Sequence, residues 1–198
     1  PGPDRRRLDA ALQGDVEACR KCSLASARQG VILGQGAVGS ALLVVGDYCC
    51  QESGFSAEML FGADEDVMLW NMMRAIGLAP SDVYVTNAVK HFRFVLEGRR
   101  RRHQAPRPSD IVSCRPWLEA ELKAVRPEVV VCLGRTAAQS LIGGQVSVEQ
   151  QRGRFFSSPF SSRIMLTYHP SSILRARDRV IQERLFDLLV QDLKTAVA

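Results

Sequence analysis

Hydrophobic residues form four short, continuous runs along this chain, each bounded by polar residues, glycine or proline. Runs of this length are typical of strands buried on both faces of a sheet, and they read "ALLVVGD" (41–47), "DVYVTN" (82–87), "EVVVCLG" (128–134) and "IMLTYHP" (164–170). Between and around them, the pattern predicts helices over 4–19, 64–78, 109–125, 135–143 and 178–196. This alternation predicts an α/β fold, a three-layer sandwich with a central four-stranded parallel sheet.

The helix over 109–125 shows how the pattern assigns a cap and a buried face. Ser109 precedes the apolar positions and is the expected N-cap. Cys114 and Leu118 then fall on one face of the helix. We therefore expect Cys114 to face the interior.

Polar residues follow all four strands at their carboxyl ends, where parallel sheets place their ligand sites. The strand ends read Gly46-Asp47, Asn87, Gly134 and His169-Pro170-Ser171. A carboxylate, an amide and an imidazole are therefore expected to converge on one rim. The alternative is that these residues only begin loops, as polar residues commonly do after strands.

Length and charge narrow the class of protein. The chain has 198 residues, so 1–198 should form one domain, with 1–14 as an N-terminal helical extension or the artificial edge of a longer chain. No apolar stretch reaches membrane-spanning length, and a soluble monomer is expected. The net charge is +5 with arginine dominant, which favours a polyanionic partner.

Cysteines stand at 19, 22, 49, 50, 114 and 132. The chain has a sizeable core and no secretory signal, so a disulfide framework is not expected. Cys132 lies inside an apolar strand and should be a buried structural thiol. The spacing of "CRKC" (19–22) presents two thiolates to one metal or cluster, and Cys114 and His91 are the candidate further ligands. His91 taken alone reads better as a surface or core histidine.

An arginine-rich segment, "EGRRRRHQAPRPS" (97–109), sets four arginines against His103. It is either a solvated basic loop or a phosphate clamp that delivers the histidine to a substrate. The run alone does not decide between them.

Several motifs together resemble the iron–sulfur uracil-DNA glycosylases of family 4, and most closely their UdgX branch. They are "TNAVKHF", "RRRRH", "CRPWLEAEL" and "TYHPSSIL", and the resemblance extends over roughly residues 15–195. It implies the glycosylase fold, uracil-containing DNA as the partner with single strands accepted, no membrane, and a bacterial cytoplasmic, nucleoid-associated location.

The resemblance also implies a [4Fe–4S] cluster. Cys19, Cys22 and Cys114 match three ligand positions, and His91 falls at the fourth, as in the UdgX branch. Imidazole is an acceptable cluster ligand. The cluster would tie the N-terminal segment to the helix that carries Cys114 and would take no part in base removal.

For base excision, the resemblance assigns roles to residues at the strand ends. Asn87 would read the edge of the extruded base, and His169 would stabilise the charge that develops on the departing base. Ser171, and with it Ser172, would hold the flanking phosphate. Asp47 takes the position of a family glutamate.

In the UdgX branch, the histidine of the arginine-rich loop captures the sugar C1′ after the base leaves. His103 matches that position, and Arg99–Arg102 would hold the loop on phosphates, with Arg102 next to the histidine. A neutral imidazole is a competent nucleophile for such a sugar.

The first motif departs from the family pattern, because it reads "GDYCCQESGFSAEMLFG" (46–62). Tyr48, Cys49 and Cys50 replace residues that line the uracil pocket, and Phe61 or Phe55 must replace the stacking phenylalanine. Three interpretations stay open: an active uracil-DNA glycosylase that crosslinks to DNA, a glycosylase for another damaged base, and a non-catalytic DNA-binding module.

Overall fold

The computed structural model describes residues 10–22, 24, 33–48, 60–91, 94–98 and 100–198. Cys49, Cys50, Phe55 and Arg99 lie outside the described residues, as do positions 4–9 of the first expected helix. The four predicted strands are all present as β1 (Leu42–Tyr48), β2 (Val83–Val89), β5 (Val129–Leu133) and β7 (Ser161–Thr167). They pair in parallel, which confirms the parallel core of the sheet.

The sheet has the strand order β2-β1-β5-β7-β6, and its last strand is antiparallel. This fifth strand, β6 (Phe155–Ser158), was not predicted. It is short, lies at the sheet edge and is only partly covered, so it lacks the continuous apolar run of the buried strands. The sheet therefore has one more strand than the sequence indicated.

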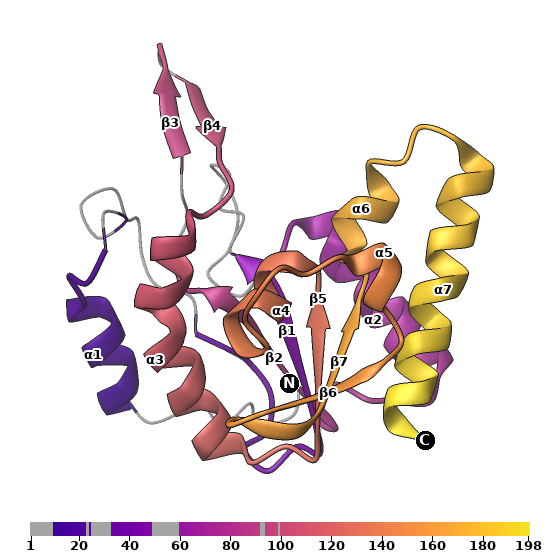
Figure 1. Ribbon diagram of the computed structural model, residues 1–198, viewed down its shortest axis with the longest axis horizontal. Coiled ribbons are helices and arrows are strands. Elements are labelled where there is room, and N and C mark those ends of the chain that lie inside the picture. Colours follow the sequence, from indigo (N-terminus) through magenta and orange to yellow (C-terminus); the bar gives the residue numbers. More distant parts are fainter. Residues whose placement is uncertain (1–9, 23, 25–32, 49–59, 92–93, 99) are drawn as a thin grey trace, which may run out of the picture.

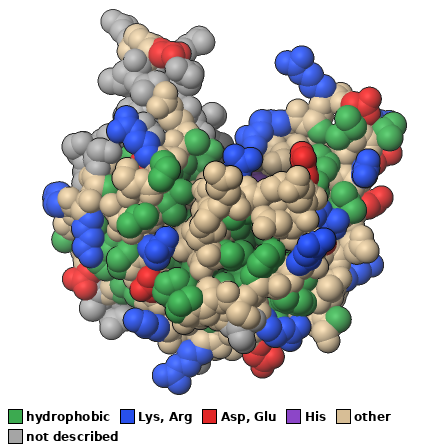
Figure 2. Space-filling model, in the orientation of Figure 1, with side chains coloured by type: hydrophobic (Ala, Val, Ile, Leu, Met, Phe, Trp, Pro, Cys, Tyr) green, Lys and Arg blue, Asp and Glu red, His purple; other side chains and the backbone are tan. Residues whose placement is uncertain are grey.

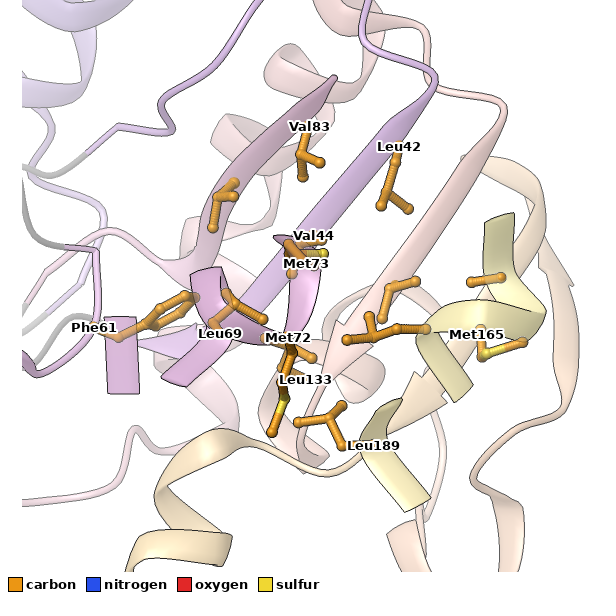
Figure 3. Packing of buried hydrophobic residues seen from close by; sticks show 14 of the residues in the cluster. Leu42, Val44, Phe61, Leu69, Met72, Met73, Val83, Leu133, Met165 and Leu189 are labelled. Carbon is orange, nitrogen blue, oxygen red and sulfur yellow. The ribbon is translucent and has the colours of Figure 1, made fainter. Parts of the chain in front are cut away.

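Helices cover both faces, because successive residues of each buried strand point to opposite sides. On one face, Leu42 and Val44 pack with α2 (Ala63–Ala75), α6 (Pro170–Leu174) and α7 (Arg179–Val197). Figure 3 shows this cluster, with Met72 and Met73 against the strand residues and Phe61 at its end. On the other face, Leu43 packs with α3 (Pro108–Val125) and α4 (Arg135–Leu141). The three layers are confirmed and visible in Figure 1.

The remaining elements surround this sandwich. The N-terminal helix α1 (Ala10–Ala18) lies beside α3, and the short α5 (Val148–Gln151) lies near the carboxyl ends of the strands (Figure 1). Among the described residues, no helix has the length and apolar character needed to cross a membrane.

The start of α3 corrects one expectation. Its N-cap is Arg107, and Ser109 is already inside the helix. Pro108 has its φ fixed near the helical value and takes the first position, and Asp110 then accepts a hydrogen bond from the Arg107 backbone N–H at 2.9 Å. The buried face of α3 does include Cys114 and Leu118, as predicted.

The arginine-rich segment is a β-hairpin and not a simple loop. Strands β3 (Phe94–Glu97) and β4 (Arg100–His103) pair antiparallel, with Phe94 opposite His103. Gly98 has a φ of +63°, a conformation that suits glycine at the turn. The hairpin projects from the end of the molecule to which the parallel strands point (Figure 1).

Candidate active site

A cavity of about 530 Å³ opens at the carboxyl ends of β1, β5 and β7. The residues of its lining that the sequence had singled out are Asp47, Tyr48, Phe61, Gly134, His169, Ser171 and Ser172. Lys and Arg side chains border the hollow at this end of the molecule (Figure 2). Three of the four strand ends thus converge on one site, as the sequence predicted for a parallel sheet.

Asp47 belongs to β1, and its carboxyl group lies against the start of α4. Its Oδ1 accepts a hydrogen bond from the Ala137 backbone N–H at 2.9 Å. Gly134 has a φ of +93°, and a Cβ at this position would lie 2.6 Å from Asp47 Oδ2. Glycine is therefore required at 134 both by the backbone conformation and by the space that the carboxyl group occupies.

The protonation of Asp47 is tuned by opposing effects. Burial raises its pKa from 3.8 to about 6, because desolvation disfavours the charged form. Backbone N–H groups of Ala137 and Thr136, and the charges of Arg175 and Arg135, act in the opposite direction. The carboxyl group is thus ionised at neutral pH but titrates close to it, as a proton acceptor in catalysis should.

His169 is the N-cap of α6, and this local geometry determines its tautomer. Its Nδ1 accepts the Ser171 backbone N–H at 3.1 Å and lies 2.8 Å from the Ser171 hydroxyl oxygen. The neutral ring therefore has its proton on Nε2. Burial, assisted by Arg175, lowers the pKa of His169 to about 4. Nε2 is buried and has no hydrogen-bond partner among the described residues, so a neutral donor is left for a ligand.

Asn87, near the end of β2, is fully buried and is not among the residues that line the cavity. Its Nδ2 donates to the Leu60 carbonyl at 2.6 Å, while Oδ1 has no partner in the described part of the chain. Gly46 lies against both Asn87 Oδ1 and the Phe61 ring, and a Cβ at 46 would collide with both. Phe61 in turn meets the His169 ring edge-on, with centroids 5.3 Å apart. Phe61 and His169 line the cavity, whereas the neighbouring Asn87 is not among its lining residues.

Charged residues that the sequence patterns did not single out also line the cavity. Arg135 and Arg175 are exposed and lie close enough to Asp47 to influence its pKa. Each directly follows a segment that had been singled out, Gly134 in one case and the "HPSSIL" stretch in the other. Their positions next to these segments are the sequence signal from which Arg135 and Arg175 could have been predicted as cavity residues.

Two of the candidate metal ligands, Cys22 and Cys114, lie close to Tyr48. Cys114 belongs to a small buried cluster with Val89 and Ile111, and Cys22 and Tyr48 pack against it. Burial raises the pKa of Cys114 to about 11; the Lys90 backbone N–H opposes this, and the nearby Cys22 and Cys19 add to it. The described cysteines form no disulfide with one another. The fourth described cysteine, Cys132, is fully buried, as expected.

His91 is buried, and neither of its ring nitrogens has a hydrogen-bond partner among the described residues. Burial lowers its pKa, so the ring is neutral. Two orphaned ring nitrogens are costly unless something else satisfies them, and this fits a ligand to a metal group. Within the described ranges, however, no three His, Cys, Asp or Glu side chains are arranged to hold a metal ion.

Comparison with known proteins identifies the family. The sequence profile of the Uracil DNA glycosylase superfamily matches residues 33–194, which cover the whole sheet and the cavity. The chain belongs to the uracil DNA glycosylase superfamily. As a member it is a DNA glycosylase, an enzyme that cleaves the bond between a base and its sugar.

Two curated members of the superfamily are similar along most of their length. The type-4 uracil-DNA glycosylase of Thermotoga maritima is 26% identical over 193 residues, which cover 97% of this chain and 94% of that protein. The type-4 enzyme of Archaeoglobus fulgidus is 29% identical over 173 residues, 81% of this chain and 80% of its own. A type-5 uracil-DNA glycosylase of Pyrobaculum aerophilum is 29% identical over a shorter stretch of 122 residues.

The predicted site residues are thus distributed over three regions of the structure. Asp47, Tyr48, Phe61, His169 and Ser171 line the cavity, and Asn87 is fully buried near Phe61. The candidate ligands Cys22 and Cys114 belong to the neighbouring cluster. Arg102 and His103 are in the second strand of the projecting hairpin, where the structure describes the backbone and not the side chains.

Proposed function

We propose that this protein excises uracil from DNA and that the cavity at the strand ends receives the extruded nucleotide. The observation that carries the proposal is the pairing, in one cavity, of a neutral histidine donor with a carboxylate poised near neutral pH. The relatives named type-4 uracil-DNA glycosylases support uracil as the base.

His169 would act on the leaving group. When the bond between C1′ and the base breaks, its electron pair moves onto the base, and negative charge develops on the base oxygen. The Nε2–H of a neutral imidazole can donate to that oxygen without a proton having to be gained first. Because Nδ1 is already held by Ser171, the ring needs no reorientation at the moment of cleavage.

Asp47 would act on the sugar. Its carboxylate accepts a proton from a water molecule, whose oxygen forms a bond to C1′ as the bond to the base breaks. The products are a free base and an abasic site. A protonated Asp47 can neither accept that proton nor stabilise the positive sugar, so activity should require the ionised form.

Asn87 would read the base. Its Oδ1 is the one polar atom of this amide without a partner in the described region, and an acceptor suits the N3–H of uracil and not the N3 of cytosine. Phe61 lines the cavity and lies near this amide, so it would have to shift, or stack on the base, when the nucleotide reaches Asn87.

His103 would capture the sugar in place of water, as the resemblance to the UdgX branch implies. One ring nitrogen forms a bond to C1′ while the bond to the base breaks, and the ring then loses its other N–H proton. The hairpin projects at the cavity end of the molecule (Figure 1), which supports this role. Arg102, next to it in β4, would bind phosphate.

We also propose that Cys19, Cys22, Cys114 and His91 hold a [4Fe–4S] cluster. The buried, unpartnered ring of His91 and the proximity of the three thiols support this assignment. Thiolates and a neutral imidazole are donors that iron–sulfur clusters accept. When bound, the cluster would serve as a structural link between α1, α3 and the end of β2.

The test is incubation of the protein with a uracil-containing single-stranded oligonucleotide, followed by a denaturing gel. His103→Ala, His169→Ala and a cytosine-containing oligonucleotide are run beside it. A shifted band that resists denaturation and is lost in His103→Ala would establish excision with capture. Cleavable abasic product without a shifted band would support excision and reject capture. Absence of both products would reject uracil excision.

A further inference from the structure

A fully buried ion pair joins the end of β2 to α3. Lys90 and Glu121 both have no exposed surface, and the Lys90 ammonium donates to Glu121 Oε2. The pair lies on the α3 face of the sheet, opposite to the face on which the Asn87 side chain lies. It is therefore no part of the cavity wall.

Both oxygens of the Glu121 carboxylate accept hydrogen bonds. Oε1 accepts the Gly34 backbone N–H at 2.8 Å and the Tyr84 hydroxyl at 3.4 Å. Oε2 accepts the Thr86 hydroxyl at 2.8 Å in addition to the ammonium of Lys90. The carboxylate is thus rigidly held, and it holds the lysine in turn.

The ammonium has a further acceptor in the backbone of the proposed base reader. Lys90 Nζ donates to the Asn87 carbonyl oxygen at 2.6 Å. Strand β2 lies at the sheet edge, so its outward carbonyls have no strand to pair with. The outward carbonyl and N–H groups of Val85 instead form two backbone hydrogen bonds with Gln35. Asn87 lies two residues further along β2, so its carbonyl points to the same side. There the Lys90 ammonium donates the hydrogen bond that a neighbouring strand would otherwise supply.

The Asn87 carboxamide has only one hydrogen bond of its own in the described structure, that to Leu60. Its position therefore depends on how firmly its backbone is held. We propose that Lys90, held by Glu121, is a positioning residue that fixes the Asn87 backbone and with it the amide that reads the base. This inference rests on the proposed function of Asn87.

Stability alone is a poor reason to bury such a pair. Removing a lysine and a glutamate from water costs several kcal/mol per ion, and apolar replacements of buried pairs are often neutral or stabilising. A positioning role explains instead why the charged donor is kept at this carbonyl. Displacement of a binding group by about 1 Å can lower a reaction rate by about 10²-fold.

The experiment compares two variants that share one substitution. Glu121→Gln keeps the Lys90 donor but leaves its charge uncompensated, so it should lose the most stability. Lys90→Met/Glu121→Gln removes the charge and the donor together, so it should be more stable than Glu121→Gln. We expect excision to follow the opposite order, with the double variant about 10²-fold slower in single turnover and Glu121→Gln within about tenfold of wild type. Thermal unfolding and oligonucleotide affinity are measured on the same samples.

A purely structural role would make excision follow stability, and that result would overturn the proposal. Tyr84→Phe is the matched control, because it removes a hydrogen bond to Glu121 but not the one from Lys90 to Asn87, and it should keep the wild-type rate. In an Asn87→Ala background, replacing the pair should cost less than about threefold, since coupled residues are not additive. A further 10²-fold loss there would show that Lys90 does not act through Asn87. If wild type itself leaves uracil in place, the proposed function fails and this inference with it.

Discussion

Replacing Asp47 by asparagine should make the protein more stable at neutral pH while it abolishes most of its activity. The pKa of Asp47 is raised from 3.8 to about 6, which corresponds to about 3 kcal/mol by which folding disfavours the ionised carboxylate. An asparagine side chain in its place would carry no charge to desolvate. The amide oxygen can still accept the Ala137 N–H, but the NH₂ group faces the Thr136 N–H, which we expect to cost about 1 kcal/mol.

The net gain expected for Asp47→Asn is therefore about 2 kcal/mol at pH 7.5. For a domain of this size, each kcal/mol raises Tm by about 2–4 °C. The gain must depend on pH in a defined direction. Because the pKa is higher in the folded than in the unfolded state, Asp47 destabilises the protein above about pH 6 and ceases to do so as pH falls toward 3.8.

The assay is thermal unfolding of wild type and Asp47→Asn between pH 4 and 8, with uracil excision measured at pH 7.5. Asp187→Asn, on an exposed part of α7, is the control for a surface aspartate. Excision by Asp47→Asn should fall by about 10²–10⁴-fold, the usual contribution of a general base. A Tm difference that is zero at pH 7.5, or that is the same at pH 4 and pH 8, would refute the reasoning on the burial of Asp47.

Three further outcomes are expected. The kcat/KM for excision should rise about tenfold per pH unit up to about pH 6, as Asp47 ionises. His169 has a pKa of about 4, so its ionisation should add no further change to the pH profile above pH 5. A rise toward pH 6 that persists in Asp47→Asn would contradict the assignment to Asp47. Arg135→Gln and Arg175→Gln should each reduce the slope of log affinity against log salt by about one. Arg126 is the C-cap of α3 and does not line the cavity, so Arg126→Gln should leave this slope unchanged. His91→Ala should lower the iron and sulfide content of the purified protein and its visible absorbance, and unchanged metal content would remove His91 from the ligand set.

The sandwich was readable from the sequence because its signals are local. Each buried strand is a continuous apolar run that ends in a polar residue, and parallel pairing brings such ends to one rim whatever the loops do. This is why the sequence alone could place Asp47, Gly134 and His169 around one cavity. Strand β6 and the hairpin of β3 and β4 were missed, since β6 is half exposed and β4 consists largely of arginine.

Other properties depend on contacts between residues far apart in the chain. The Asp47 carboxylate owes its hydrogen bond to Ala137, ninety positions away, and the space it occupies to the glycine at 134. Lys90 and Glu121 were not singled out, because a lone lysine and a glutamate in a helix give no sign that they meet.

The sequence by itself thus determined the fold class, the edge of the sheet that carries the site and the types of chemical group available there. Only the tertiary structure decided which of these groups are buried, which tautomer and protonation state they take, and that Phe61 lines the cavity while Asn87 does not. The reason is physical: strand and helix formation follow local patterns of side chains, whereas desolvation and hydrogen bonding depend on every element that packs around a group.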